Sequence, residues 1–244
     1  MRDAIVGAAG GDARSALQTL ELARDHARSR GAAAPTVDDV VEASRRRPVL
    51  YDKDGDRHYD TISAFIKSVR GSDPDAALYY LASMIEGGED PRFLARRLLI
   101  LASEDIGNAD PHALVLAAAC WQTVAAIGLP EARYALAQTT AYLALAPKSN
   151  AAAVAINLVT EEVQARGNRR APADLRDTSY RGARALGHGR GYLYPHDFPD
   201  GWVDQVYAPE GLEDARFYEP TDRGEEARLR ARLEELRRRR DGGA

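Results

Sequence analysis

Apolar side chains recur at helical spacing through most of the chain before residue 170. In the segment 62–69 they stand at the first, fourth, fifth and eighth positions, and 93–101 follows a similar pattern with one polar interruption. Spacings of three and four residues place these side chains on one face of a helix. Short segments separate such runs, which favours antiparallel neighbours. We therefore predict an all-α protein whose helices from about residue 60 to 166 pack as a compact stack.

Pairs of aspartate and proline mark the starts of several predicted helices. They are Asp73-Pro74, Asp90-Pro91 and Asp110-Pro111. An aspartate accepts hydrogen bonds from the free N–H groups of the first turn, and proline fits the first helical position. Pro130 and Ser149-Asn150 predict two further starts. Helix ends with left-handed glycines are predicted at Gly71, Gly87-Gly88, Gly107, Gly128 and Gly167.

Changes in composition divide the chain into five segments. In the first, Thr36 and Asp39 predict a capping box at the start of a helix. The fourth is rich in proline, glycine and aromatic residues, and we expect it to be ordered, irregular chain that wraps the helices. The segments are a small helical domain (1–48), a polar linker (49–59), the helical stack (60–168), the irregular segment (169–220) and an amphipathic helix with a tail (221–244).

Composition narrows the class of protein. Hydrophobic residues make up 45% of the chain and aromatic residues 7%, which suits close-packed helices. The formal net charge of −4 means that any contact with nucleic acid would need a local basic patch. The single cysteine, Cys120, provides no disulfide framework. Without an apolar stretch of about 20 residues or an export signal, we expect a cytoplasmic protein that does not enter a membrane.

A local basic patch lies between Arg166 and Arg190, where seven arginines accompany two aspartates and Tyr180. Guanidinium groups bind phosphates and aromatic rings stack under bases, so this mixture favours single-stranded nucleic acid. The alternative interpretation is a subunit interface or pairing within the chain. The candidate nucleic-acid contacts are Arg169, Arg170, Arg176, Arg184 and Arg190.

Neither a metal site nor a catalytic centre is predicted in this chain. The first acidic cluster lacks the spacing of a calcium-binding loop. Adjacent carboxylates on a helix diverge by about 100° and do not face one another. The histidine cluster has irregular spacing and no thiolate. The three clusters are Asp52, Asp54 and Asp56; Glu104-Asp105; and His188, His196 and Asp197.

Arg14 stands in the first turn of a predicted helix that begins at Asp12. A cation there faces the positive end of the helix dipole, which disfavours it by a few tenths of a kcal/mol to about 1 kcal/mol. The same helix end attracts anions, so Arg14 is a candidate for contact with a nucleotide phosphate. The alternative is an exposed arginine paired with Asp12 or Glu21.

The rest of a nucleotide site is not recognisable. A phosphate-binding loop needs a lysine directly after a glycine. The chain holds three lysines, Lys53, Lys67 and Lys148, and none follows a glycine. We therefore expect this chain alone neither to bind ATP well nor to hydrolyse it.

Several motifs occur in order along the chain, at 11–21, 56–74, 102–107, 146–150 and 186–197. They begin with Gly11-Asp12-Ala13-Arg14 and include Ala102-Ser103-Glu104-Asp105-Ile106-Gly107 and Ala146-Pro147-Lys148-Ser149-Asn150. Together they resemble the C-terminal part of the RarA/MgsA family, the replication-associated recombination protein A group of AAA+ ATPases. The resemblance covers residues 9 to about 218.

This resemblance implies an AAA+ lid up to about Pro48, followed by a domain through which the family forms homotetramers. Arg14 would be the sensor 2 arginine, which contacts the terminal phosphate of ATP in the intact, Mg-dependent enzyme. The family is related to clamp loaders, shows DNA-stimulated ATPase activity, acts at stalled replication forks and interacts with single-strand-binding protein. This chain would then be the oligomerisation and nucleotide-sensing portion. The alternative is a single-stranded nucleic-acid-binding module that uses the basic segment 166–190.

Overall fold

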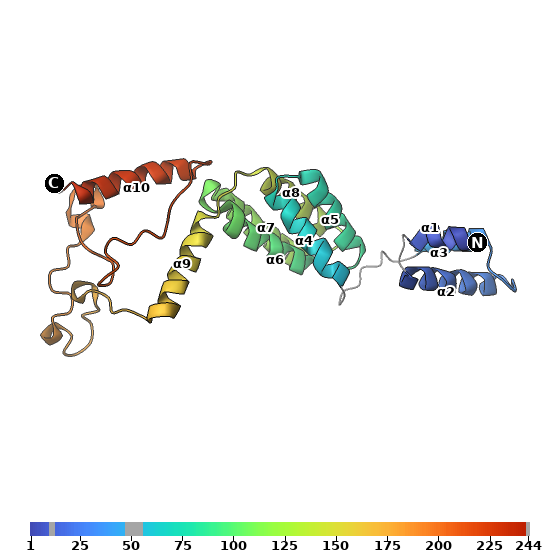
Figure 1. Cartoon of the computed structure of the whole chain (residues 1–244), viewed down its shortest axis with the longest axis horizontal. Coiled ribbons are helices and arrows are strands. Elements are labelled where there is room, and N and C mark those ends of the chain that lie inside the picture. Colours follow the sequence, from blue (N-terminus) through green and yellow to red (C-terminus); the bar gives the residue numbers. More distant parts are fainter. Residues whose placement is uncertain (10–12, 47–55, 243–244) are drawn as a thin grey trace. The chain divides into compact units, whose positions relative to one another are not determined.

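The computed structural model describes residues 1–9, 13–46 and 56–242 (Figure 1). Within these ranges the secondary structure is helical and contains no strand, which confirms the predicted all-α class. The chain divides into two compact units. The first comprises Met1–Arg97 and Cys120–Ala144, and the second comprises Leu98–Ala119 and Leu145–Ala244. No helix in the described ranges is both long and apolar enough to cross a membrane.

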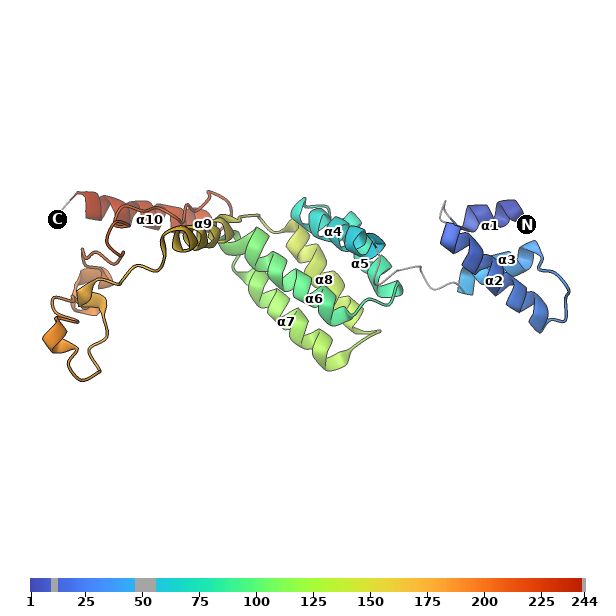
Figure 2. The same cartoon turned by 60° about the horizontal axis from the view of Figure 1, so that its bottom comes forward.

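Three helices at the start of the first unit pack on one another, as both views show (Figures 1 and 2). They share a small core of Ala23, Val40 and Ala43, against which Ile5 and Leu22 are partly buried. Small side chains at these positions allow close approach of the helices. The helices are α1 (Arg2–Ala9), α2 (Ala13–Ser29) and α3 (Val37–Arg46).

Asp39 links α2 to the start of α3. Its carboxylate is 1% exposed and accepts hydrogen bonds from the Thr36 backbone N–H (2.7 Å) and hydroxyl (2.8 Å). The Asp39 N–H donates to Thr36 Oγ1 at 3.3 Å, which confirms the predicted capping box. Arg30 Nη2 lies 2.6 Å from both carboxylate oxygens, and His26 Nδ1 lies 2.7 Å from one. The bonds from Thr36, with help from Arg30 and His26, hold the pKa of Asp39 well below its usual range.

The helical stack follows the predicted starts closely. Asp73 Oδ1 accepts a hydrogen bond from the backbone N–H of Ala76 at 2.9 Å. Asp90 and Asp110 accept equivalent bonds two residues ahead, at 2.9 and 3.1 Å. All three aspartates therefore cap a helix as predicted, although Pro111 lies in the turn before α7 and not at its first residue. The helices are α4 (Asp56–Arg70), α5 (Pro74–Glu86), α6 (Pro91–Leu101), α7 (His112–Ile127) and α8 (Ala132–Leu145).

The remaining start and end predictions need small corrections. Pro130 lies in the turn before α8 rather than at its first residue. Ser149, and not Asn150, accepts a hydrogen bond from the N–H of Ala151 (3.3 Å) at the start of the next helix. Gly71 continues the helical bonding of α4 through its N–H to Lys67 O (2.7 Å), so the left-handed residue is Ser72 (φ 64°). The other predicted ends do contain a left-handed glycine: Gly88, Gly107, Gly128 and Gly167.

In the first unit, α4 and α5 pack together and bury Phe65, Val69 and Met84. Leu94 in α6 and Leu136 in α8 are also fully buried. Phe65, Val69 and Leu94 belong to the apolar faces that the spacing of 62–69 and 93–101 predicted. The apolar pattern of the sequence therefore specifies the core of this unit.

The second unit contains a π-helical turn, η1 (Ala102–Ile106), a 3₁₀ turn, η2 (Gly107–Ala109), and two long helices. These helices are α9 (Ala151–Arg166) and α10 (Glu226–Asp241). The chain between α9 and α10 is irregular (Figure 2). Its short 3₁₀ turns are η3 (Ala173–Leu175), η4 (Arg184–Leu186), η5 (Pro195–Asp197) and η6 (Pro199–Gly201).

A buried carboxylate fixes the start of α10. Glu226 is fully buried and accepts hydrogen bonds from the Tyr218 hydroxyl (2.8 Å), the Thr221 N–H (3.0 Å) and the Thr221 hydroxyl (2.6 Å). Ser149 donates a further bond, and Asn108 Nδ2 donates to the Tyr218 hydroxyl at 2.9 Å. Burial alone would raise the pKa of Glu226, but these hydrogen bonds outweigh it and the pKa lies below its usual value. The carboxylate thus joins three segments that are distant in sequence.

We expect Glu226→Gln to lower the free energy of unfolding by about 1–3 kcal/mol, because the amide NH₂ cannot accept the bonds from Thr221. Urea unfolding followed by circular dichroism measures this change. Glu225→Gln is the matched control, because Glu225 is 63% exposed and only loosely paired with Arg228. Equal losses in the two variants would contradict the structural role of Glu226.

The carboxylate of Glu226 also makes the free energy of unfolding depend on pH. Because folding depresses the pKa of Glu226, its contribution to stability is present above the ordinary value of 4.5 and is lost as the pH falls through the folded-state value. The difference in stability between the native chain and Glu226→Gln should therefore shrink below about pH 4.5. A constant difference down to pH 3 would be inconsistent with this linkage.

Candidate functional site

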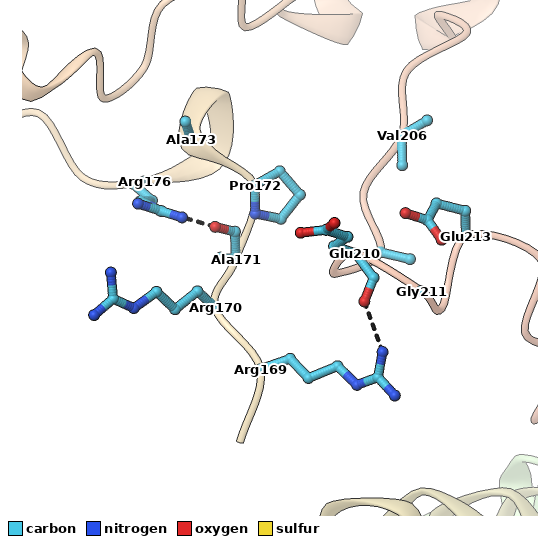
Figure 3. A pocket seen from close by; sticks show the side chains of 11 residues that line it. Arg169, Arg170, Ala171, Pro172, Ala173, Arg176, Val206, Glu210, Gly211 and Glu213 are labelled. Carbon is cyan, nitrogen blue, oxygen red and sulfur yellow. Dashed lines mark hydrogen bonds between the residues drawn. The ribbon is translucent and has the colours of Figure 1, made fainter. Parts of the chain in front are cut away.

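Three of the five predicted nucleic-acid contacts line one hollow in the second unit (Figure 3). The hollow has a volume of about 950 Å³ and lies between the stretches 169–176 and 206–213. The first stretch is mostly irregular chain after α9. Side chains of both charges line the hollow, including Arg169, Arg170, Arg176, Val206, Glu210 and Glu213.

The side chain of Arg169 links two segments of this unit through hydrogen bonds. Its Nη1 donates to the carbonyl oxygen of Glu210 at 2.7 Å, and its Nη2 donates to the carboxylate of Glu162 in α9 at 2.9 Å. Backbone N–H groups at Glu213 and Gly211, with a smaller contribution from Arg169, hold the pKa of Glu213 below its usual value. The alternative interpretation of pairing within the chain therefore applies to this arginine.

Arg170 and Arg176 are directed away from the 206–213 stretch, whereas Arg169 is directed toward it (Figure 3). Arg176 Nε donates to the carbonyl oxygen of Ala171 at 2.7 Å, and its side chain is half-buried. Arg170 is exposed, and no hydrogen bond or ion pair joins it to another described residue. Arg190 is likewise exposed, outside the hollow, and the side chain of Arg184 lies outside the described residues.

The tyrosines of the basic segment remain accessible. Tyr180 is 46% exposed, and its hydroxyl lies 2.8 Å from Nδ1 of His188. Tyr194 packs its ring on His196 with the centroids 5.1 Å apart. Both histidines therefore contact tyrosine rings, and the described residues contain no group of three or more potential metal ligands.

The carboxylate pair in η1 is split by burial, because Asp105 is buried whereas Glu104 is exposed. Burial lowers the pKa of Lys148, and the charge of Asp105 acts in the opposite direction. Lys148 Nζ also donates to the carbonyl oxygen of Ala146 at 2.6 Å. These contacts belong to the interior of the unit, as expected for a structural role.

The remaining candidates lie at the edge of the described structure. Arg14 is the second residue of α2, in its first turn, and its side chain lies outside the described residues. Asp52 and Asp54 also lie outside them, and Asp56 is the first residue of α4. The sensor role of Arg14 therefore stays a prediction.

Helix α9 forms an apolar surface that the sequence analysis did not single out. In this unit it contacts η1 and η2, while most of its length is exposed. Val154, Ile156, Leu158 and Val163 are 43%, 62%, 44% and 47% exposed. A mainly apolar groove of about 480 Å³ runs beside it, lined by Leu99, Ile100, Ala152, Ala153 and Ile156 together with Ser103 and Glu104. The available signal was the run 151–159, which is apolar except for Asn157 and is typical of a buried helix.

Two family models match the chain. The model described as AAA C-terminal domain matches residues 1–70, and the model described as MgsA AAA+ ATPase C terminal matches residues 71–237. The chain belongs to the MgsA family of AAA+ ATPases. The family resemblance predicted from the motifs is thereby confirmed. The two matched ranges meet where α4 ends, at Arg70.

Curated relatives agree with this assignment. An uncharacterized AAA domain-containing protein of Mycobacterium tuberculosis is 53% identical over 235 residues, which cover 96% of this chain and 52% of the relative. Replication-associated recombination protein A of Coxiella burnetii is 43% identical (98% and 54% covered), and that of Bacillus subtilis is 44% identical (88% and 51% covered). The chain spans about half the length of these relatives.

Replacing Arg169 with alanine should loosen the 206–213 stretch, because the bonds to Glu210 and Glu162 are lost. We expect amide hydrogen exchange there to accelerate about fivefold, which corresponds to the ~1 kcal/mol contributed by one hydrogen bond. Arg170→Ala is the control, since Arg170 is exposed and makes no such bond. Equal exchange rates in the two variants would show that Arg169 does not link these segments.

Proposed function

We propose that this chain is the oligomerisation and nucleotide-sensing portion of a clamp-loader-related, DNA-dependent ATPase that maintains replication forks and acts in recombination. Membership of the MgsA family supports the proposal that the whole protein is an AAA+ ATPase. The name of two relatives, replication-associated recombination protein A, supports the proposed process. The chemistry of ATP and Mg would reside in the whole protein, and this portion would assemble the subunits.

The observation that carries the assembly role is the exposed apolar surface of α9. The first part of α9, residues 151–159, is apolar except for Asn157, which is typical of a buried helix. Yet Ile156 is 62% exposed, and Leu158, on the opposite face, is 44% exposed. Contiguous exposed apolar surface marks a site of association. The groove beside Ile156 extends this surface onto Leu99 and Ile100.

A second copy of the chain is the occupant that we propose for this surface. The groove and the exposed apolar side chains beside it allow symmetric pairing, because each copy offers the same surface to its partner. Two such pairs would give the homotetramer that the family resemblance implies.

Nucleotide sensing is assigned to Arg14. Its place in the first turn of α2 supports this role, since a helix N-terminus attracts phosphate and a guanidinium there adds charge-assisted hydrogen bonds. The ion pairs of Arg30 with Asp39 hold α2 and α3 together. Movement of the phosphate-contacting end would therefore be transmitted to both helices.

Ile156→Glu should weaken self-association by at least about thirtyfold, because a charge would replace an apolar side chain in the interface at a cost of ~2 kcal/mol. Sedimentation equilibrium measures the change. The native chain should approach a mass four times its 26.6 kDa, and the variant should sediment at half that mass or less, because the pairing through α9 is lost.

The control for this experiment is Val6→Glu in α1, because Val6 is exposed to a similar extent, 58%. It should assemble like the native chain. A native chain that sediments as a monomer at tens of micromolar, or equal effects of the two substitutions, would refute the assembly role.

Single-strand binding by the basic segment is the second candidate function. Arg170 and Arg176 gather beside the hollow, Arg190 is exposed, and Tyr180 offers an accessible ring in the same segment. Cations with accessible aromatic rings are typical of single-strand binding. Because Arg169 is held by Glu210 and Glu162, it is left out of this proposal.

Replacing Arg170, Arg176 and Arg190 together with alanine should weaken binding of a labelled oligothymidylate and reduce the slope of log K against log salt by up to about 3, roughly one per phosphate contact. Fluorescence anisotropy measures both quantities. A variant that loses three exposed arginines of α10 controls for overall charge; these are Arg228, Arg232 and Arg238. The same loss in both variants would argue against a specific role for the basic segment.

A further inference from the structure

A basic pocket lies on the first unit, between one face of α4 and the start of α6. Its volume is about 460 Å³. On α4 the lining positions recur every three or four residues from 59 to 70, and on α6 they are Phe93 and Arg97, one turn apart. Helical spacing places the lining residues on one face of each helix, and the fold brings these two faces together.

The charge of this pocket is of one sign. Lys67, Arg70 and Arg97 line it, and none of its lining residues is a carboxylate. Lys67 is exposed, and neither Lys67 nor Arg97 forms an ion pair with any described residue. Like charges gathered in a concave surface attract an anion.

Arg97 supplies a second, independent observation. Its Nε is buried and has no hydrogen-bond acceptor among the described residues. Buried N–H groups in folded proteins almost always have an acceptor, so an orphan beside a pocket indicates a missing partner. An oxygen of an anion bound in the pocket would satisfy this donor and form a charge-assisted hydrogen bond.

The aromatic side chains indicate which anion fits. Tyr59 is 68% exposed and belongs to the lining of the pocket. The Phe93 ring lies in the wall, with the guanidinium carbon of Arg96 5.9 Å from its centroid. A carboxylate ligand would interact only with the basic side chains of the pocket, whereas a single strand of nucleic acid would also stack its bases on an accessible ring.

We infer that this pocket binds a phosphate of single-stranded nucleic acid, with Lys67 and Arg97 as its contacts and Tyr59 as the stacking ring. The site lies on the first unit, apart from the basic segment 166–190 of the second. It depends neither on the assembly through α9 nor on Arg14.

Fluorescence anisotropy tests the inference on the full chain. The probe is a fluorescein-labelled oligothymidylate of about 20 nucleotides, which is longer than the ~4–16 nucleotides that a single OB fold covers. Lys67→Glu should weaken binding about tenfold and reduce the salt slope by about 1, since one phosphate contact is lost. Arg92→Glu is the control, because it makes the same charge change at an exposed position of α6 outside the pocket.

Two further variants test the hydrogen-bond donor and the aromatic ring of the pocket without removing a charge. Arg97→Lys keeps the charge but removes the Nε donor, so binding should weaken about threefold with the salt slope unchanged. Tyr59→Ala should weaken binding by a similar factor, whereas Tyr79→Ala, at a residue that is 69% exposed outside the pocket, should not. Circular dichroism melts verify that each variant is folded.

The inference is overturned if Lys67→Glu and Arg92→Glu bind the oligonucleotide equally. It is also overturned if an acidic peptide, poly-glutamate, binds in a Lys67-dependent way while the oligonucleotide does not, because the pocket would then serve a protein partner. Self-association is measured separately by sedimentation, so loss of assembly in Ile156→Glu leaves this test unaffected. Oligonucleotide binding that depends on Lys67, Arg97 and Tyr59 together supports the site.

Discussion

The buried carboxylate of Glu226 is the interaction on which the second unit depends. It receives hydrogen bonds from Tyr218 and Thr221, at the end of the irregular segment, and from Ser149, just before α9. Asn108 extends the network to η2 through the Tyr218 hydroxyl. The α10 backbone adds a bond from the Glu225 N–H to the carbonyl oxygen of Ala109 at 2.8 Å. Because a buried charge is tolerated only when it is fully hydrogen-bonded, these segments are held in one arrangement.

The position of Gly224 shows how closely the segments approach. A Cβ atom at this residue would collide with the carbonyl oxygen of Ala109 and with Pro147, and its backbone has φ 53°. Only glycine fits both requirements. The exposed length of α9 and the arginines beyond it thus extend from a rigid polar junction. A rigid base is what an interface or a binding surface needs if its geometry is to be kept.

The hydrogen-bond and ion-pair partners of each arginine distinguish those with a structural role from those that are candidates for binding. Arg30 and Arg169 bind carboxylates and carbonyl groups of their own unit, so their charges are already used. Arg170 and Arg97 lie beside hollows and have no carboxylate partner among the described residues. Charge counted along the sequence cannot make this distinction, because pairing depends on segments that are brought together by the fold.

The sequence by itself determined the helices, because capping and apolar spacing act over a few residues. Asp73, Asp90 and Asp110 cap their helices as predicted, and Thr36 and Asp39 form the predicted capping box. The ordered motifs also identified the family. Only the tertiary structure decided that Glu226 is buried, that Arg169 links two segments, that Arg97 faces a pocket and that α9 is exposed. These properties depend on contacts between residues far apart in sequence, and the spacing of residues within one helix does not predict such contacts.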